Sequence, residues 1–194
     1  PLNVIWWCQL RPMKDIIPVL PELYASGLRA VCWGVESGSQ RILDLMKKGT
    51  NVHDSALVLK ESHQAGIKNM LYIMFGFPSE TKEEFLQTIA FLKENDDSID
   101  LVCTNVFGLQ KRSPIFKNQD LFGIQEVQEQ PRTILSEKIT YRVDSGMQNE
   151  EAKKMRKRYK LTLRKLNKLP SSFDYFKEQV LIFTAPPLEQ VLQK

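Results

Sequence analysis

Polar and charged side chains follow four apolar runs in the first 110 residues of the chain. Arg11 follows the first run, Glu36 and Ser37 follow the second, and Glu80 comes shortly after the third. If these runs form a parallel sheet, their carboxyl ends meet at one edge, which is where such sheets bind ligands. An edge that carries an arginine and two carboxylates suits a zwitterionic or amine-bearing ligand better than a bare phosphate.

Glu36 is the most informative of these side chains. A carboxylate directly after a buried strand costs desolvation free energy unless a partner compensates it, and a ligand ammonium or ribose hydroxyl would do so. Alternatively, Glu36 accepts N–H groups of the following turn or pairs with Arg11. The sequence favours the ligand for Glu36, whereas Arg11 can equally bind a ligand carboxylate or only neutralise Glu36.

The turn after the third run contains Gly76, Pro78 and Glu80. Gly76 is expected to let a ligand approach the backbone closely, and Pro78 is expected to fix the turn that starts the next helix. The alternative is an ordinary strand-to-helix turn. Glu80 either faces the ligand or compensates the positive end of the helix dipole, and the sequence leaves both roles open.

The four apolar runs are predicted to be the strands that position these residues. They are nearly continuous, which is typical of parallel strands covered on both faces. The predicted strands are residues 3–9, 29–34, 68–75 and 101–107. Helical patterns lie between them, at residues 18–26, 39–47, 52–66 and from Thr81 onward. This alternation predicts an α/β fold with a parallel sheet and helical crossovers.

Two helices have recognisable N-terminal caps. Ser39 is expected to cap the second helix, and Thr81 with Glu84 is a capping box for the last. The periodicity breaks after Gly108. There the sequence predicts a long loop, a short strand, one amphipathic helix and a tail that packs back as a short helix and an extended piece, at residues 110–131, 133–143, 149–169 and 170–194.

The composition is that of a soluble globular chain. Of its 194 residues 42% are hydrophobic and 26% charged, and the net charge of +4 is concentrated near the C-terminus. No run approaches the roughly 20 apolar residues of a membrane span, and no signal peptide is visible, so we expect a cytoplasmic protein without a membrane partner. The chain opens on Pro1 without an initiator methionine, and we expect it to be an internal fragment.

The residues that most often bind metals are not at ligand spacing. Three cysteines are widely spaced within apolar runs and are predicted to be core thiols: Cys8, Cys32 and Cys103. His53 and His63 have no cysteine or second histidine at ligand spacing and are predicted to be surface or packing residues. The sequence therefore predicts no metal ligands.

Several motifs, in their order and spacing, resemble the second half of the catalytic barrel of the radical S-adenosylmethionine (SAM) superfamily. They are GVESG at residues 34–38, AGI at 65–67 and FGFPSET at 75–81, which precedes an acidic helix. The resemblance is greatest to the branch with methylthiotransferases and cobalamin-dependent radical enzymes. It covers about residues 2–114, and residues 146–158 resemble the helix that follows the barrel in that branch.

The resemblance implies the C-terminal part of a partial (β/α)6 TIM-like barrel with parallel strands, plus a C-terminal helical extension. The resemblance divides the chain into three segments: the second half of the barrel at residues 1–116, a loop and short strand at 117–148, and the helical extension at 149–194. The resemblance implies that Glu36 and Ser37 contact the SAM ribose or amino acid, that residues 76–80 with Gly76, Pro78 and Glu80 approach the adenine, and that Phe107 and Leu109 close the adenine pocket. Arg11 and Phe75 complete the predicted SAM-binding set. Ser79 stands where glycine is usual, and residues 110–116 replace the usual Pro-Gly-Thr.

The cofactors that the resemblance implies are SAM and a [4Fe–4S] cluster, whose three cysteines form a CxxxCxxC loop. No two cysteines of this chain are closer than Cys8 and Cys32. The resemblance therefore implies that the cluster ligands precede this chain in a parent enzyme, and that the fragment alone is inactive. That parent would cleave SAM to a 5′-deoxyadenosyl radical acting on an unidentified small-molecule substrate, and an upstream cobalamin domain is compatible with it.

Two functions of other classes stay open. The basic helix at residues 149–169 would suit RNA binding, as in a tRNA-modifying enzyme, but a solvated Lys/Arg face is favoured because no aromatic residues interleave the charges. Neutral substitutes for Lys157 and Arg158 would distinguish the two. The other function is a non-radical α/β domain that binds a different small molecule. Self-association through the open edge of the first strand is a further expectation.

Overall fold

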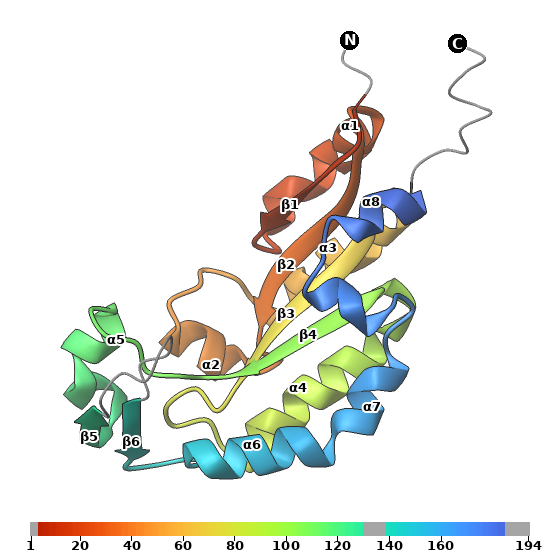
Figure 1. The fold of residues 1–194 in the computed structure, drawn as a ribbon. Helices are drawn as coiled ribbons and strands as arrows, with labels where there is room; N and C mark the ends of the chain where they lie inside the picture. Colours follow the sequence, from red (N-terminus) through yellow and green to blue (C-terminus); the bar gives the residue numbers. More distant parts are fainter. Residues whose placement is uncertain (1–3, 130–138, 185–194) are drawn as a thin grey trace, which may run out of the picture.

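A computed structural model describes residues 4–129 and 139–184 of the chain (Figure 1). Its centre is a four-stranded sheet in the order β1-β2-β3-β4, in which all neighbouring strands are parallel. The strands are β1 Trp6–Leu10, β2 Leu28–Glu36, β3 Lys68–Phe75 and β4 Leu101–Val106. The predicted parallel sheet is confirmed, and β3 has the predicted bounds.

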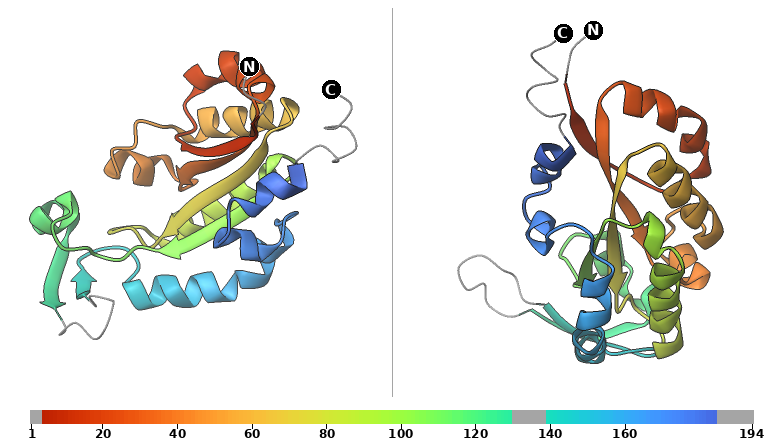
Figure 2. Two further views of the ribbon diagram at one scale, coloured as in Figure 1. Left: turned by 45° about the horizontal axis from the view of Figure 1, so that its top comes forward. Right: turned by 90° about the vertical axis from the view of Figure 1, so that its right-hand side faces the viewer.

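Helices between the strands cover one face of the sheet, here called the outer face (Figure 2, right). They are α1 Leu20–Ala25, α2 Gln40–Leu45, α3 Val52–Gln64 and α4 Lys82–Glu94. A 3-10 turn, η1 Lys14–Val19, contains Pro18, so the α-helix begins only after that residue. A second 3-10 turn, η2 Asp96–Ser98, follows α4. The main core, with the fully buried Trp33, Phe75 and Phe85, lies between this layer and the sheet.

The caps are only partly as predicted. Thr81 and Glu84 form the capping box of α4, as expected. Ser39 stands at the N-cap of α2, but its hydroxyl makes no cap bond and donates instead to Glu84 Oε1 at 3.1 Å. The prediction of a Ser39 cap is therefore wrong, because a buried carboxylate from another helix takes its hydrogen bond.

The predicted long loop at residues 110–131 is also wrong. It contains a short helix, a 3-10 turn and a strand: α5 Pro114–Lys117, η3 Gln119–Phe122 and β5 Ile124–Glu129. β5 pairs antiparallel with β6 Ile139–Val143, the described part of the predicted strand at 133–143. Both strands bury few side chains, notably Ile124 and Val143, so their sequences lack a strong alternating pattern.

The predicted single helix at residues 149–169 is divided at Tyr159 into α6 Asn149–Arg158 and α7 Lys160–Lys165. The ring of Tyr159 packs on Phe85 of α4, with the ring centroids 5.5 Å apart. The tail then passes around the edge of β4. Asn167 Oδ1 accepts the N–H of Val102 at 2.9 Å, and the N–H of Leu169 donates to the carbonyl of Asp100.

Beyond this point the tail covers the opposite, inner face of the sheet through η4 Ser171–Asp174 and α8 Gln179–Thr184. The prediction that the tail packs back on the sheet is therefore confirmed up to residue 184, where the described part of the chain ends. Phe173 and Val180 contact the inner-face side chains Cys32, Met70 and Cys103. Cys32 and Cys103 are buried free thiols, as predicted, and Cys8 is half-buried. Burial raises the pKa of Cys32 to about 11.

The remaining predictions concern metal ligands, membrane-spanning helices and the open edge of the sheet. Within the described ranges 4–129 and 139–184, no group of three metal-ligating side chains gathers, and no helix has the length and apolarity needed to cross a membrane. β1 and β4 are the outer strands of the sheet. Self-association through β1 stays a prediction.

Candidate functional site

The carboxyl ends of the four parallel strands lie along one edge of the sheet, here called the rim. Arg11 follows β1, Glu36 ends β2, Gly76 follows β3 and Phe107 follows β4. The structure thus brings the segments of the sequence-predicted site to one edge, because parallel strands share a direction. The details around each side chain differ from the expectations.

Glu36 pairs with Lys48, not with Arg11. Lys48 Nζ donates to Glu36 Oε1 at 2.7 Å, and the two side chains are 27% and 13% exposed. Arg11 Nη1 donates to the carbonyl oxygen of Lys48 at 3.1 Å. The proposed Arg11–Glu36 pair is therefore wrong. Lys48 was not predicted as the partner because it lies just after the predicted helix at residues 39–47, and the sequence does not show that its side chain returns to the end of β2.

The backbone at Glu36 is unusual. Its φ of +67° lies in the left-handed region, which a residue with a side chain rarely adopts. The β2–β3 register shifts at this point, between Gly34 and Glu36. This local conformation ends the strand and places a partly exposed carboxylate, with an ammonium already beside it, at the rim.

Ser37 is held within the protein. Ser37 is only 1% exposed. Its Oγ lies 3.2 Å from Thr88 Oγ1 and accepts the N–H of Ser39 at 3.1 Å. Thr88 Oγ1 also accepts the N–H of Gly38 at 2.9 Å. These contacts attach the turn after β2 to α4 and engage the Ser37 hydroxyl within the protein, so the SAM contact of Ser37 stays a prediction.

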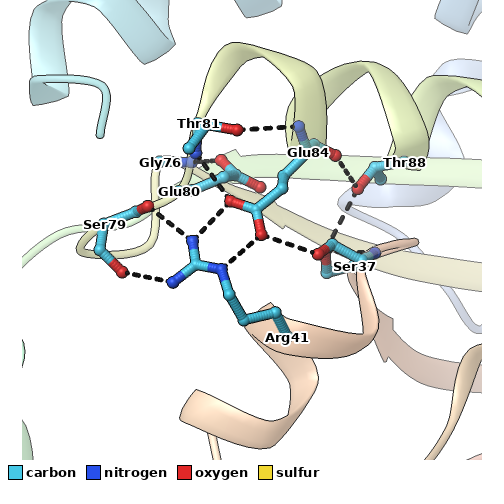
Figure 3. A network of polar contacts seen from close by, with 9 residues as sticks. Ser37, Arg41, Gly76, Ser79, Glu80, Thr81, Glu84 and Thr88 are labelled. Atoms are coloured by element: carbon cyan, nitrogen blue, oxygen red, sulfur yellow. Dashed lines mark hydrogen bonds and ion pairs between the residues drawn. The ribbon is translucent and has the colours of Figure 1, made fainter. Parts of the chain in front are cut away.

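Arg41 and Glu84 form the best-defined ion pair near the rim (Figure 3). Arg41 Nε donates to Glu84 Oε1 and Nη2 donates to Oε2, both at 2.6 Å, and Nη2 also donates to the carbonyl of Ser79 at 2.8 Å. The guanidinium hydrogen bond holds the pKa of Glu84 below its usual value despite burial. This two-point contact joins α2, α4 and the turn after β3.

Sequence reasoning missed this pair. Glu84 was assigned only to the capping box, where its Oε2 does accept the N–H of Thr81 at 2.9 Å. Arg41 lies 43 residues earlier in the sequence, on a short helix. Without contact information, an arginine on a short helix looks like any solvated cation.

Glu80 is fully buried. Its Oε2 accepts the N–H of Gly76, and within the described part of the chain its buried Oε1 has no hydrogen-bond partner. Burial raises the pKa of Glu80 to about 8, and the hydrogen bond from Gly76 opposes this rise. Glu80 thus closes the turn after β3, while Thr81 and Glu84 cap α4.

The buried carboxyl of Glu80 makes stability depend on pH. Between its ordinary pKa of 4.5 and about 8, the folded chain keeps this proton while the unfolded chain loses it. The free energy of unfolding should therefore fall as pH rises through this window and level off above it. Glu80→Gln is neutral at every pH, so it should be the more stable protein near pH 8, by about 1–3 kcal/mol.

Urea unfolding at several values from about pH 5 to about pH 8 checks this expectation. Glu83→Gln is the matched control, because Glu83 is exposed in the same helical turn and its substitution should leave the wild-type slope unchanged. A wild-type stability that stays level over this range would show that Glu80 is already ionised in the folded chain.

Helix α6 approaches Gly76, so the requirement for glycine has a reason within the protein, and the predicted ligand contact of its backbone stays a prediction. A Cβ on this residue, whose φ is +69°, would lie 2.6 Å from the Cβ of Ala152 in α6. Gly76 is therefore required where α6 crosses the end of β3. Phe75 and Pro78 are both buried on either side of it.

Phe107 and Leu109 are 8% and 5% exposed, and they belong to a cluster with the β5–β6 hairpin. Phe77 meets Phe107 edge to face, with the centroids 5.3 Å apart. Asn149 Nδ2 donates to the carbonyl of Phe107 at 2.7 Å, and Tyr141 OH donates to it at 3.3 Å. Their adenine contact stays a prediction.

The comparisons with known proteins match this part of the molecule. A family model described as the radical SAM superfamily matches residues 10–92. An uncharacterised methyltransferase of Pyrococcus horikoshii is 32% identical over 95 residues, which are 49% of this chain and 21% of that protein. A tRNA-2-methylthio-N(6)-dimethylallyladenosine synthase of Shewanella baltica is 31% identical over 108 residues, which are 55% of this chain and 22% of that protein.

One solved structure that the chain resembles is the radical SAM methyltransferase TsrM of Kitasatospora setae with cobalamin and a [4Fe–4S] cluster bound. Its TM-score is 0.51 at 19% identity, over 65% of this chain and 26% of that chain. This similarity supports the fold alone, and with the parallel sheet it confirms the expected partial barrel. The chain spans about a quarter or less of the length of these relatives.

Proposed function

We propose that the chain, which matches the radical SAM superfamily through residues 10–92, is the part of a radical SAM enzyme barrel that holds one side of the SAM molecule. SAM carries an ammonium, a carboxylate and ribose hydroxyls, and the rim offers both charge signs. The observation that carries the proposal is the Glu36–Lys48 pair, which places a partly exposed carboxylate and ammonium at the end of β2.

Glu36 is the residue we assign to the SAM ammonium or ribose. Its carboxylate already holds an ammonium 2.7 Å away, so the position stabilises a cation of the size that SAM presents. In the free protein Lys48 occupies the position proposed for the SAM cation, and Arg11 holds the Lys48 backbone through its hydrogen bond to the carbonyl oxygen. The turn after β3, stiffened by Arg41 and Glu80, would border the adenine.

The cluster does not fit the residues of this chain. No two of its cysteines are closer in sequence than Cys8 and Cys32, and the two buried thiols face the inner-face core among apolar side chains. In the proposed enzyme the cluster ligands come from outside these residues. With both groups bound, reductive cleavage of SAM would supply a 5′-deoxyadenosyl radical that removes hydrogen from a substrate still to be identified.

Three other assignments have less support. A non-radical α/β domain that binds a different ligand would leave the family match and the motifs at residues 34–38 and 75–81 without a reason. A cobalamin domain and a tRNA substrate are attributes of particular relatives. This chain spans only about a quarter or less of those proteins, so neither attribute is assigned to it.

The direct test is production of 5′-deoxyadenosine by the complete protein that contains this chain. After anaerobic reconstitution with iron and sulfide, addition of SAM and a reductant is expected to release 5′-deoxyadenosine, measured by liquid chromatography. Protein whose cluster is assembled by spectroscopic criteria, but which releases none with SAM bound, would refute radical chemistry. A protein that binds no SAM at all would refute the assignment of the rim.

A further inference from the structure

A cleft with a volume of about 590 Å³ opens along the outer edge of β4. Its floor is the first part of that strand, at Leu101, Val102 and Thr104. One wall is formed by α6 and α7, and the other by the tail from Ser171 to Tyr175, which passes to the inner face (Figure 2, right). The cleft therefore lies beside the strand, whereas the rim lies at the strand's carboxyl end.

The cleft is strongly basic. Five cations of α6 and α7 line it against one carboxylate, Asp174: Lys153, Arg156, Lys157, Lys160 and Arg164. Lys153 pairs with Glu150 at 2.6 Å, and Arg156 Nε donates to Thr104 Oγ1 at 2.8 Å. Among the residues that the structure describes, no carboxylate pairs with Lys157, Lys160 or Arg164, and all three are exposed. Their charge is thus available to an anion.

These three cations form a row. Lys157 lies at the end of α6, and Lys160 and Arg164 lie on α7, three and four residues apart. Helical hydrogen bonds continue across the junction at Tyr159, so the cations recur about once per turn and the row extends roughly 10 Å. A single phosphate would need cations that converge on one point. A row spaced by about one turn instead suits a chain of anions, such as the phosphates of a nucleic-acid backbone.

An exposed aromatic ring faces the same cleft from the opposite wall. Tyr175 lines the cleft and is 82% exposed. An exposed ring beside phosphate-binding cations is the arrangement on which unpaired bases stack. The sequence did not suggest it, because Tyr175 lies outside the basic helix and joins the cations only when the tail turns around β4.

The edge of β4 is poorly suited to bind an acidic peptide as an added strand. Asn167 already accepts the N–H of Val102, and Arg156 binds the Thr104 side chain. A peptide that added a strand to β4 would require that edge to be open. The charges and the ring favour a nucleic acid instead.

We propose that the cleft binds single-stranded nucleic acid, with Lys157, Lys160 and Arg164 on successive phosphates and Tyr175 stacked on a base. This inference is independent of SAM binding, because the residues involved are separate from the rim. The proposal also divides the basic residues of α6 and α7 into those that line the cleft and those that do not. Lys154, Arg158 and Lys165 lie on the same helices but do not line the cleft.

The test is fluorescence anisotropy of the chain with a labelled single-stranded RNA of about 12 nucleotides, within the range of known single-strand site sizes. Lys157→Gln, Lys160→Gln and Arg164→Gln combined should weaken binding at least about tenfold near 50 mM salt, and should lower the salt slope by about 2. The matched control combines Lys154→Gln, Arg158→Gln and Lys165→Gln, and should change binding less than about threefold, although it removes the same charge.

The aromatic contact has its own pair of variants. Tyr175→Ala should weaken RNA binding about tenfold, and Tyr175→Phe should bind as the wild type does, because stacking needs the ring and not the hydroxyl. A DNA strand of the same sequence should bind comparably, and a blunt duplex should bind more weakly.

Several results would overturn the proposal. They are no RNA binding near 50 mM salt, equal losses in the two triple variants, and duplex binding as tight as single-strand binding. Competition by polyglutamate or tripolyphosphate as effective as by RNA, with no effect of Tyr175→Ala, would identify a general anion site instead. All six cations and Tyr175 are exposed, so circular dichroism should confirm that each variant folds.

Discussion

Replacing Gly146 with alanine is expected to lower the free energy of unfolding by about 3 kcal/mol, within the range for overpacked and strained sites. The φ of Gly146 is +76°, and a Cβ there would lie 2.5 Å from the carbonyl carbon of Ser79 and 2.6 Å from the oxygen of Glu80. Both are backbone atoms of the turn after β3. The N–H of Met147 donates to that same Glu80 oxygen at 2.7 Å, so the two segments cannot separate without losing this bond.

Urea unfolding followed by circular dichroism measures this loss. Gly108→Ala is the matched control, because a Cβ at Gly108 meets no atom within 4 Å, and it should change stability by less than about 0.5 kcal/mol. If Gly146→Ala were as stable as the control, the close contact between residue 146 and the turn after β3 would be absent in solution.

Replacing Glu36 with glutamine is expected to weaken SAM binding to the complete protein about 10- to 100-fold, since a hydrogen bond to a charged group contributes about 1.5–3 kcal/mol. The substitution keeps the size of the side chain and removes its charge, so it tests the attraction for the SAM ammonium or ribose. Equilibrium dialysis with labelled SAM measures the dissociation constant. Glu22→Gln, at an exposed carboxylate on α1, is the control and should leave binding unchanged.

Lys48→Met distinguishes a ligand-binding Glu36 from a structural one. If the ligand cation takes the position of the Lys48 ammonium, loss of that competitor should tighten or preserve SAM binding. If the pair only holds the loop after α2, Lys48→Met and Glu36→Gln should weaken binding alike and lower stability alike. Unchanged affinity in Glu36→Gln would refute the role of Glu36.

Much of the fold follows from local patterns. The apolar run from Lys68 to Phe75 is too continuous and too rich in large side chains to be anything but a covered strand, and the Thr81 capping box marks the start of α4. The β5–β6 hairpin did not follow, because each strand is mostly polar and becomes a strand only by pairing with the other. The division at Tyr159 likewise depends on packing against Phe85, 74 positions earlier in the printed sequence.

The site was predictable in position more than in chemistry. Residues after parallel strands must share an edge, so the position of Arg11 and Glu36 at the rim was predictable, while their contacts with SAM stay predictions. The partner of Glu36 was not, because Lys48 reaches it from a loop that lies beyond a whole helix. The contact of Ala152 with Gly76 was not predicted either, because a sequence does not show which neighbour approaches a glycine.

The tail that passes around β4 has a consequence for synthesis of the protein. The N–H of Val102 finds its partner only at Asn167, 65 positions later. At translation rates of roughly 5–20 residues per second, several seconds pass before this partner is made, and until then β4 is an uncovered strand edge. Such edges recruit other nascent chains into aggregates. The tail therefore protects the edge of β4 from such association only after residue 167 has been made.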